Sequence, residues 1–171
     1  MQNKIVIKKI SEENLSKAGK LTNSIFPDEV TAPSVGLAAS FDNKAFKLIN
    51  SKNSNKFNWF KYWVAVDPKS DKALGTIGIY EEKSDSDDSC WLGWYCVDPE
   101  YRGNHLGSML MDFAVTQAES IGKKYLKVFT SKGESRAAAH HVYKKYGFES
   151  LLNGELDDEN TLYLQKDLGI D

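Results

Sequence analysis

Arg102, Gly103 and Gly107 stand in a short stretch between an apolar segment and a segment whose apolar residues have helical spacing. The first backbone N–H groups of a helix have no partner within the helix and carry partial positive charge, so they can bind an anion. The guanidinium of Arg102 can add a charge-assisted contact, and the glycines let a diphosphate approach the backbone closely. The stretch therefore predicts a diphosphate site in front of a helix that begins at about His105.

Two other nucleotide-binding classes fit this stretch poorly. A P-loop ends in Lys-Ser or Lys-Thr and a dinucleotide fingerprint reads GxGxxG, and the stretch has neither. The two cysteines, Cys90 and Cys96, have no histidine at ligand spacing, so we expect no metal site and no disulfide framework. A nucleophilic role for Cys96 is disfavoured because no histidine partner is evident.

The elements around this stretch indicate a mixed α/β fold. Apolar runs predict about seven strands, at residues 5–10, 62–66, 74–80, 91–97, 125–130, 148–152 and 161–165. Helical spacing predicts three or four helices, at residues 12–25, 33–49, 105–121 and 136–146. Their mixed order implies a sheet that is part antiparallel and part parallel. Gly75 and Gly78, within one strand, predict either a bulge or a close approach to the backbone.

The composition is that of a globular protein. With 171 residues, we expect residues 1–171 to form a single domain. A net charge of -2 with no local basic patch predicts that nucleic acid is not a partner. The longest apolar run is far short of the ~20 residues of a membrane helix, so we expect a cytoplasmic protein with no membrane contact. The sequence leaves open a homodimer.

Two segments carry a resemblance to a known family. Residues 97–107, VDPEYRGNHLG, resemble the acyl-CoA-binding motif of the GCN5-related N-acetyltransferases (GNAT), whose core is Arg/Gln-x-x-Gly-x-Gly/Ala at the start of a helix. Residues 139–149, AHHVYKKYGFE, resemble the Ala-x-x-x-Tyr-x-x-x-Gly-Phe run of the same family. The resemblance implies the GNAT fold, with a mixed, mostly antiparallel sheet that is splayed at the cofactor site and flanked by helices.

The resemblance also implies the reaction and its residues. Acetyl would pass directly from acetyl-CoA to an amine of a small molecule or peptide, without a covalent enzyme intermediate. The N–H of Val97 would polarise the thioester carbonyl, and Tyr143 would protonate the leaving thiolate, because charge develops at these two points. The implied cofactor-binding residues are Cys96, Val97, Arg102, Gly103, Asn104, His105, Leu106, Gly107, Ser108, Arg136 and Tyr143.

The sequence departs from the family pattern at His105, where the motif usually has glycine. We expect residue 105 to lie within helical dihedrals with its side chain turned outward. The alternatives are lowered cofactor affinity, or an imidazole that touches a phosphate, so that binding weakens as pH rises past about 6.5.

The central strand, WLGWYC, has no carboxylate or imidazole to act as general base. The candidate carboxylates are Glu81 and Glu82, at the end of the preceding strand, with Asp98 less favoured, and we take Glu82 as the candidate. A base that acts through water is the alternative. The acidic segment 82–89 is expected to be a solvated hairpin loop, or else a lip that attracts a cationic substrate. The tryptophans at 59, 63, 91 and 94 are candidates for an acceptor wall.

Two further function classes share these motifs. A non-catalytic acyl-CoA-binding or sensing module would explain the missing strand base and His105, although the presence of Tyr143 counts against it. Transfer of a longer acyl group, or acylation of a hydroxyl, would need the same cofactor contacts.

Overall fold

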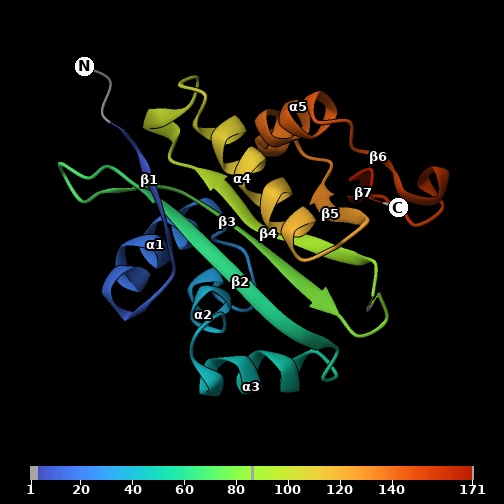
Figure 1. The fold of residues 1–171 in the computed structure, drawn as a ribbon, viewed down its shortest axis with the longest axis horizontal. Helices are drawn as coiled ribbons and strands as arrows, with labels where there is room; N and C mark the ends of the chain where they lie inside the picture. Colours follow the sequence, from blue (N-terminus) through green and yellow to red (C-terminus); the bar gives the residue numbers. More distant parts are fainter. Residues whose placement is uncertain (1–3, 86, 171) are drawn as a thin grey trace.

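A computed structural model describes residues 4–85 and 87–170, and it is built on one seven-stranded sheet with the strand order β1-β2-β3-β4-β5-β7-β6 (Figure 1). All neighbouring strands are antiparallel except β4 and β5, which are parallel. The strands are β1 (Val6–Lys9), β2 (Phe57–Val66), β3 (Ala73–Glu82), β4 (Ser89–Val97), β5 (Tyr125–Ser131), β6 (Glu149–Ser150) and β7 (Thr161–Asp167).

Five α-helices in the described residues cover both faces of the sheet. They are α1 (Glu12–Ile25), α2 (Pro33–Ala38), α3 (Asn43–Lys52), α4 (Leu106–Ser120) and α5 (Ala137–Lys145). Side chains alternate along a strand, so Trp63 and Ala65 of β2 pack with α4 while Tyr62, Val64 and Val66 pack with α1, α2 and α3. Each face therefore has its own hydrophobic core.

The sequence-based expectations for these elements are largely confirmed. Ser11 caps α1, and its backbone N–H donates to Asn14 Oδ1 at 2.9 Å. The single helix expected over residues 33–49 is two helices, because Asp42 accepts a hydrogen bond from Lys44 N at 2.7 Å and starts α3 anew. This break makes five helices where three or four were expected. The strand expected at 148–152 is only Glu149–Ser150, since residues 151–154 turn into a 3₁₀ helix.

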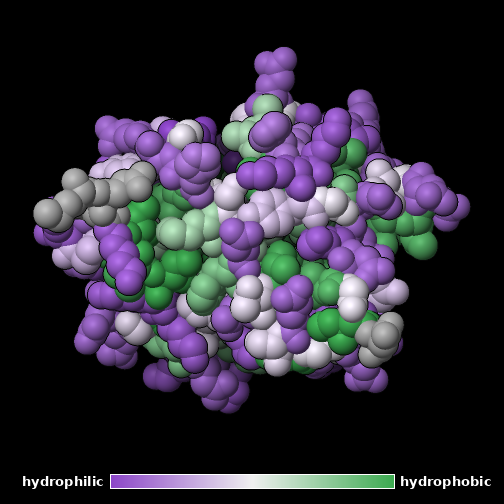
Figure 2. Space-filling view, turned by 45° about the horizontal axis from the view of Figure 1, so that its top comes forward, coloured by the Kyte–Doolittle hydropathy of each residue, from purple (hydrophilic) through white to green (hydrophobic). Residues whose placement is uncertain are grey.

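No helix in the described part of the chain is long and apolar enough to cross a membrane. On the face drawn in Figure 2, hydrophobic residues show mainly in recesses between hydrophilic side chains.

Strands β4 and β5 stay paired over only part of their length. Their register covers three residue pairs, Ser89 to Trp91 against Tyr125 to Lys127, and then the strands part. Beyond this point the β3–β4 register shifts between Thr76 and Gly78, so two residues of β4 oppose one residue of β3. Trp94 lies in this bulge with a left-handed φ of 40°, and Thr76 Oγ1 donates to its carbonyl at 2.7 Å. A bulge bends its strand, which accounts for the parting of β4 from β5.

A row of three residues crosses the sheet beside the bulge. Tyr62 is paired with Gly78, and Gly78 is paired with Gly93. A Cβ atom at Gly78 would overlap the Tyr62 ring, and one at Gly93 would lie 2.5 Å from the Tyr62 hydroxyl. The two glycines thus let the phenol of Tyr62 lie flat over β3 and β4. Of the two expectations for Gly78, the close approach of another group to its backbone is confirmed, whereas the bulge beside it lies in the neighbouring strand β4.

Substitution of Gly78 by alanine should destabilise the protein, because the new methyl group has no room beneath the Tyr62 ring. Overpacking of this kind costs about 3 kcal/mol, to be measured as the free energy of unfolding in urea. Gly133→Ala is the matched control, since its Cβ would meet only the Ser131 and Ser135 hydroxyls at 3.8 Å. Equal stability of Gly78→Ala and the control would contradict this packing.

Candidate active site at the parting of two strands

Two cavities meet where β4 and β5 part. The first, which we name the loop-side cavity, has a volume of about 480 Å³ and is lined by the start of α4, the end of β4 and α5. The second, the aromatic cavity, has a volume of about 520 Å³ and lies on the face of the sheet that α1 to α3 cover. Tyr95, Arg136 and Ala139 line both cavities. The opening between the strands therefore connects the two faces of the sheet.

The loop-side cavity contains most of the residues implied for cofactor binding. Its lining includes Cys96, Val97, Arg102, Gly103, His105, Gly107, Ser108 and Arg136. Three of the implied residues do not line it: Asn104 donates from Nδ2 to Tyr101 O at 3.3 Å, Leu106 is buried in the core, and Tyr143 lines the aromatic cavity instead. For Leu106, only the backbone could take part in a site.

His105 does not have the helical dihedrals that we expected. It is the N-cap of α4, with φ 60° and ψ 4°, which is the left-handed region. The sequence-based expectation was wrong because the helix begins one residue later, at Leu106. The glycine that the family motif usually has at this position is explained by the backbone conformation, because a residue with a Cβ is strained in the left-handed region. Glycine is favoured at position 107 for a different reason, because a Cβ there would lie 2.8 Å from the Tyr95 hydroxyl.

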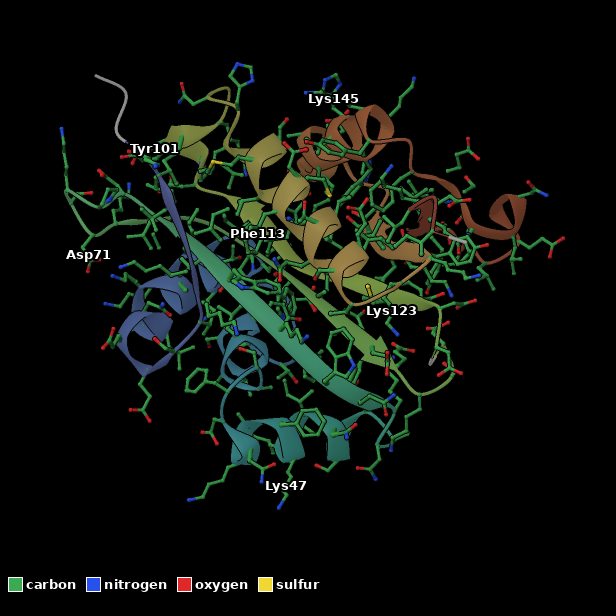
Figure 3. The ribbon with its side chains drawn as sticks, in the orientation of Figure 1. Lys47, Asp71, Tyr101, Phe113, Lys123 and Lys145 are labelled. Atoms are coloured by element: carbon green, nitrogen blue, oxygen red, sulfur yellow. The ribbon has the colours of Figure 1, made fainter. Side chains whose placement is uncertain are left out.

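The loop-side cavity is rich in basic side chains. Arg102 and Arg136 were expected from the sequence, whereas Lys145 and His141 of α5 were missed. Their spacing of four residues on a helix would have placed them on one face with Val142, which also lines the cavity. Lys145 Nζ donates to Ser108 Oγ at 3.3 Å and so joins α5 to the first turn of α4. In Figure 3, Lys145 lies near the end where α4 begins, whereas Lys123 lies beyond its opposite end.

Two N–H groups of β4 face the opening. Asp98 N donates to Leu74 O of the neighbouring strand at 2.8 Å. Successive N–H groups of a strand point to opposite edges, so those of Val97 and Tyr95 point away from β3, toward the side where the pairing with β5 has ended. Val97 lines only the loop-side cavity, whereas Tyr95 lies at the junction of the two cavities.

Tyr143 of α5 reaches the aromatic cavity from the opposite side of the opening. Its side chain is 4% exposed, and its ring centroid lies 6.0 Å from that of Tyr95 and 5.5 Å from that of Phe148. No hydrogen bond to its hydroxyl exists among the residues that the structure describes. Burial raises the pKa of Tyr143 above its ordinary value, so the phenol keeps its proton at neutral pH.

The thiol of Cys96 is buried and lies 3.2 Å from Thr76 Oγ1. Burial raises its pKa to about 11, so the nucleophilic thiolate is scarce at neutral pH. The geometry agrees with the expectation that Cys96 is not the nucleophile.

Neither carboxylate considered as general base lines a cavity. Glu81 points to the α4 face, where it forms an ion pair with Lys123 and accepts from Asn58 Nδ2 at 2.6 Å. Glu82 lies on the same face as the aromatic cavity, but its carboxylate is paired with Lys56 Nζ at 2.7 Å. In the segment 82–89, of which Ser86 lies outside the described residues, Asp85 is also paired within the protein, whereas Asp87 and Asp88 are exposed. Asp85 accepts from Lys127 Nζ at 2.7 Å and from Trp91 Nε1 at 2.6 Å.

The tryptophans proposed as an acceptor wall are distributed over both faces. Trp94 lines the aromatic cavity, where its ring packs edge-on against Phe26 at 5.3 Å. Trp63 packs against Phe113 on the other face of the sheet, and Trp91 is buried beneath Tyr80. The described residues contain no group of three or more His, Cys, Asp and Glu side chains that could hold a metal ion.

A comparison with protein families places this fold among the acyltransferases. A family model described as an acetyltransferase (GNAT) domain matches residues 58–150, which is more than half of the 171 residues. The chain therefore belongs to the GNAT acetyltransferase family, and the mixed seven-stranded sheet is the GNAT fold. A comparison with curated protein sequences gives no significant match.

Solved structures of the family share the whole architecture. An acetyltransferase from Streptococcus agalactiae 2603 is 21% identical, with a TM-score of 0.68, over 98% of this chain and 99% of that chain. An aminoglycoside 6'-N-acetyltransferase complexed with coenzyme A is 17% identical, with a TM-score of 0.66, over 95% and 97%. Arabidopsis thaliana NAA60, in complex with a bisubstrate analogue, is 16% identical, also with a TM-score of 0.66, over 95% and 97%. At these identities the likeness establishes the fold.

The loop-side cavity suits an acyl-CoA. The first N–H groups of α4 provide donors for a diphosphate, and Arg102, Arg136 and Lys145 supply positive charge around them. Beyond Trp91, β4 has no residue pairs with β5, so the end of β4 that lines this cavity can offer backbone N–H groups to an extended amide-bearing arm. The residues present therefore fit the cofactor that the family uses.

Substitution of His105 by glycine should raise the free energy of unfolding by about 1 kcal/mol. The left-handed backbone is strained for histidine and free for glycine, and the larger entropy of glycine in the unfolded chain offsets only part of the gain. His105→Ala is the control, since it removes the imidazole but keeps the strain, and it should not be stabilised. Thermal unfolding of the three proteins checks this, and stabilisation of both variants would contradict backbone strain as the cause.

Proposed function

We propose that this chain is an N-acetyltransferase that transfers acetyl from acetyl-CoA to the amine of a small molecule, within a single domain of residues 1–171. The observation that carries the proposal is the meeting of a cationic, helix-capped cavity and an aromatic cavity at the parted strands, with Tyr95 and Tyr143 beside the junction. Such an arrangement lets a cofactor enter from one face of the sheet and an acceptor from the other.

In the proposed reaction, the amine nitrogen attacks the thioester carbonyl carbon directly. The N–C bond forms, the C–S bond breaks, and the electron pair of that bond stays on sulfur. The N–H of Tyr95 is the better placed donor for the carbonyl oxygen because Tyr95 lies at the junction, and Val97 N–H is then left for the pantetheine arm. The phenol of Tyr143 donates its proton to the thiolate, which leaves as the free thiol of coenzyme A, and the second proton lost from the acceptor nitrogen restores the phenol.

The acceptor must lose a proton before or during attack. An amine with a pKa near 10.4 is neutral in about one molecule per thousand at pH 7, which corresponds to about 4 kcal/mol. Because the Glu82 carboxylate is paired with Lys56 and does not line the aromatic cavity, we propose water in that cavity as the proton acceptor. This replaces Glu82 as the candidate base.

Release of free thiol from acetyl-CoA tests the proposed function. The protein should release thiol in the presence of an acceptable amine, with an equal amount of acetylated amine detected by mass spectrometry. Tight acetyl-CoA binding without release for any amine in a broad panel would favour the non-catalytic module. Faster release from longer acyl-CoA chains would favour a different acyl group.

Tyr143→Phe should lower kcat by about a hundredfold and leave the Kd for acetyl-CoA nearly unchanged. The variant keeps the ring between Tyr95 and Phe148 but removes the only proton that it can donate. Tyr125→Phe is the control, because Tyr125 lines neither cavity. Equal turnover of the two variants would remove Tyr143 from the mechanism.

The pH dependence of kcat/KM for the amine should be a simple rise. Below about pH 10, each pH unit raises the neutral fraction of the amine about tenfold. The raised pKa of Tyr143 keeps the acid protonated over the same range, so no descending limb should appear below about pH 10. A bell-shaped profile that falls between pH 7 and 9, in protein that circular dichroism shows to be folded, would contradict this assignment.

A further inference from the structure

We propose that the aromatic cavity binds a primary amine carried on an uncharged aromatic or apolar body, with the Tyr62 hydroxyl as its hydrogen-bonding contact. This inference rests on the proposed function, and it names the substrate class of the same site.

The cavity surface is mainly aromatic. Phe57, Phe60, Tyr62 and Tyr80 form a continuous cluster along its floor, with ring centroids 4.8 to 6.1 Å apart. These residues come from β2 and β3, far in the sequence from the two motifs that bind the cofactor. Rings of this kind bind apolar and aromatic groups over large areas with little loss of side-chain freedom.

Tyr62 provides a polar group inside this surface. Its side chain is 3% exposed, and its hydroxyl has no hydrogen-bond partner among the described residues. No fully buried side-chain oxygen in the described residues lacks a partner, so the Tyr62 hydroxyl must be open to the cavity that it lines. It lies over Gly93, one residue before the bulge at Trp94. A hydroxyl that opens into the cavity is available to form a hydrogen bond with a bound acceptor.

The charged residues that line the cavity do not match a polycation. They are Glu29, Lys56 and Arg136. Lys56 is paired with Glu82, Arg136 lies over the Phe26 ring at 4.4 Å, and Glu29 is exposed. The acidic segment after β3 does not add to this lining: Asp85 is paired with Lys127, and the exposed Asp87 and Asp88 do not line the cavity. A polyamine or aminoglycoside would bring several positive charges to a cavity whose lining has one exposed carboxylate.

Tyr62 is chosen as the contact because its hydroxyl opens into the cavity. Burial raises the pKa of the phenol, so the hydroxyl is neutral and can donate a hydrogen bond to an acceptor or accept one from it. A neutral contact adds no negative charge to the cavity, so it favours the ammonium form, which cannot attack the thioester, less than a carboxylate would. The aromatic floor then holds the body of the acceptor while the hydroxyl fixes its polar end.

The test compares acceptors that differ in charge and body. 2-Phenylethylamine and 2-cyclohexylethylamine are measured against spermidine, kanamycin and a neutral tripeptide, each with acetyl-CoA. The kcat/KM of the two monoamines should exceed that of every other acceptor by at least about tenfold. Equal or better turnover of spermidine, kanamycin or the tripeptide would overturn the inference while leaving N-acetyl transfer intact.

A Tyr62→Phe variant tests the contact itself. It should raise the KM for 2-phenylethylamine about tenfold, with kcat and the Kd for acetyl-CoA little changed, because only a neutral hydrogen bond is lost. Tyr125→Phe is the matched control, and circular dichroism verifies the fold of both variants. An unchanged KM in folded Tyr62→Phe would overturn the role of the hydroxyl.

Calorimetry separates failure of this inference from failure of the proposed function. Each amine is titrated into protein saturated with coenzyme A. A lower Kd for 2-phenylethylamine than for spermidine, without turnover of any amine, would support the proposed ligand class and reject the transferase activity. Preference for spermidine would reject the substrate class directly.

Discussion

The site depends on the point at which the pairing of β4 with β5 ends. The two strands share three residue pairs and then separate, because the bulge at Trp94 bends β4 while Thr76 holds the bulged carbonyl from the other side. The features of the candidate site follow from this gap between the strands. It frees the N–H groups of Tyr95 and Val97, it admits Tyr143 from α5, and it joins a cavity on one face of the sheet to a cavity on the other.

The two cavities differ in the physical chemistry of their linings. On the α4 and α5 side, a helix N-terminus and cationic side chains favour a polyanionic cofactor. On the other side, rings from β2 and β3 favour an apolar body, and the ionisable groups are paired or exposed. Gly78 and Gly93 contribute to the second cavity by leaving space, since the Tyr62 phenol could not cross the sheet over side chains. The two faces of one sheet thus carry a basic cavity and an aromatic cavity.

The sequence was informative where the chemistry is local. The start of α4, the strands on either side of it and the position of Tyr143 all depend on short motifs and on regular apolar spacing. It was less informative where distant residues meet. Nothing local indicates that Tyr62 lies over Gly93, or that the Glu82 carboxylate is paired with Lys56. The left-handed backbone of His105 was missed because the motif sets the start of the helix only to within a residue or so.

The central claim is that the thioester lies where β4 and β5 part, between strand N–H groups and the Tyr143 phenol. A crystal structure of the protein with acetyl-CoA tests it most directly. The account predicts that the diphosphate accepts hydrogen bonds from backbone N–H groups at the start of α4, and that the thioester carbonyl accepts one from Tyr95, with sulfur beside Tyr143. A pantetheine arm that lies outside the opening, with β4 and β5 closed over Tyr95, would contradict it.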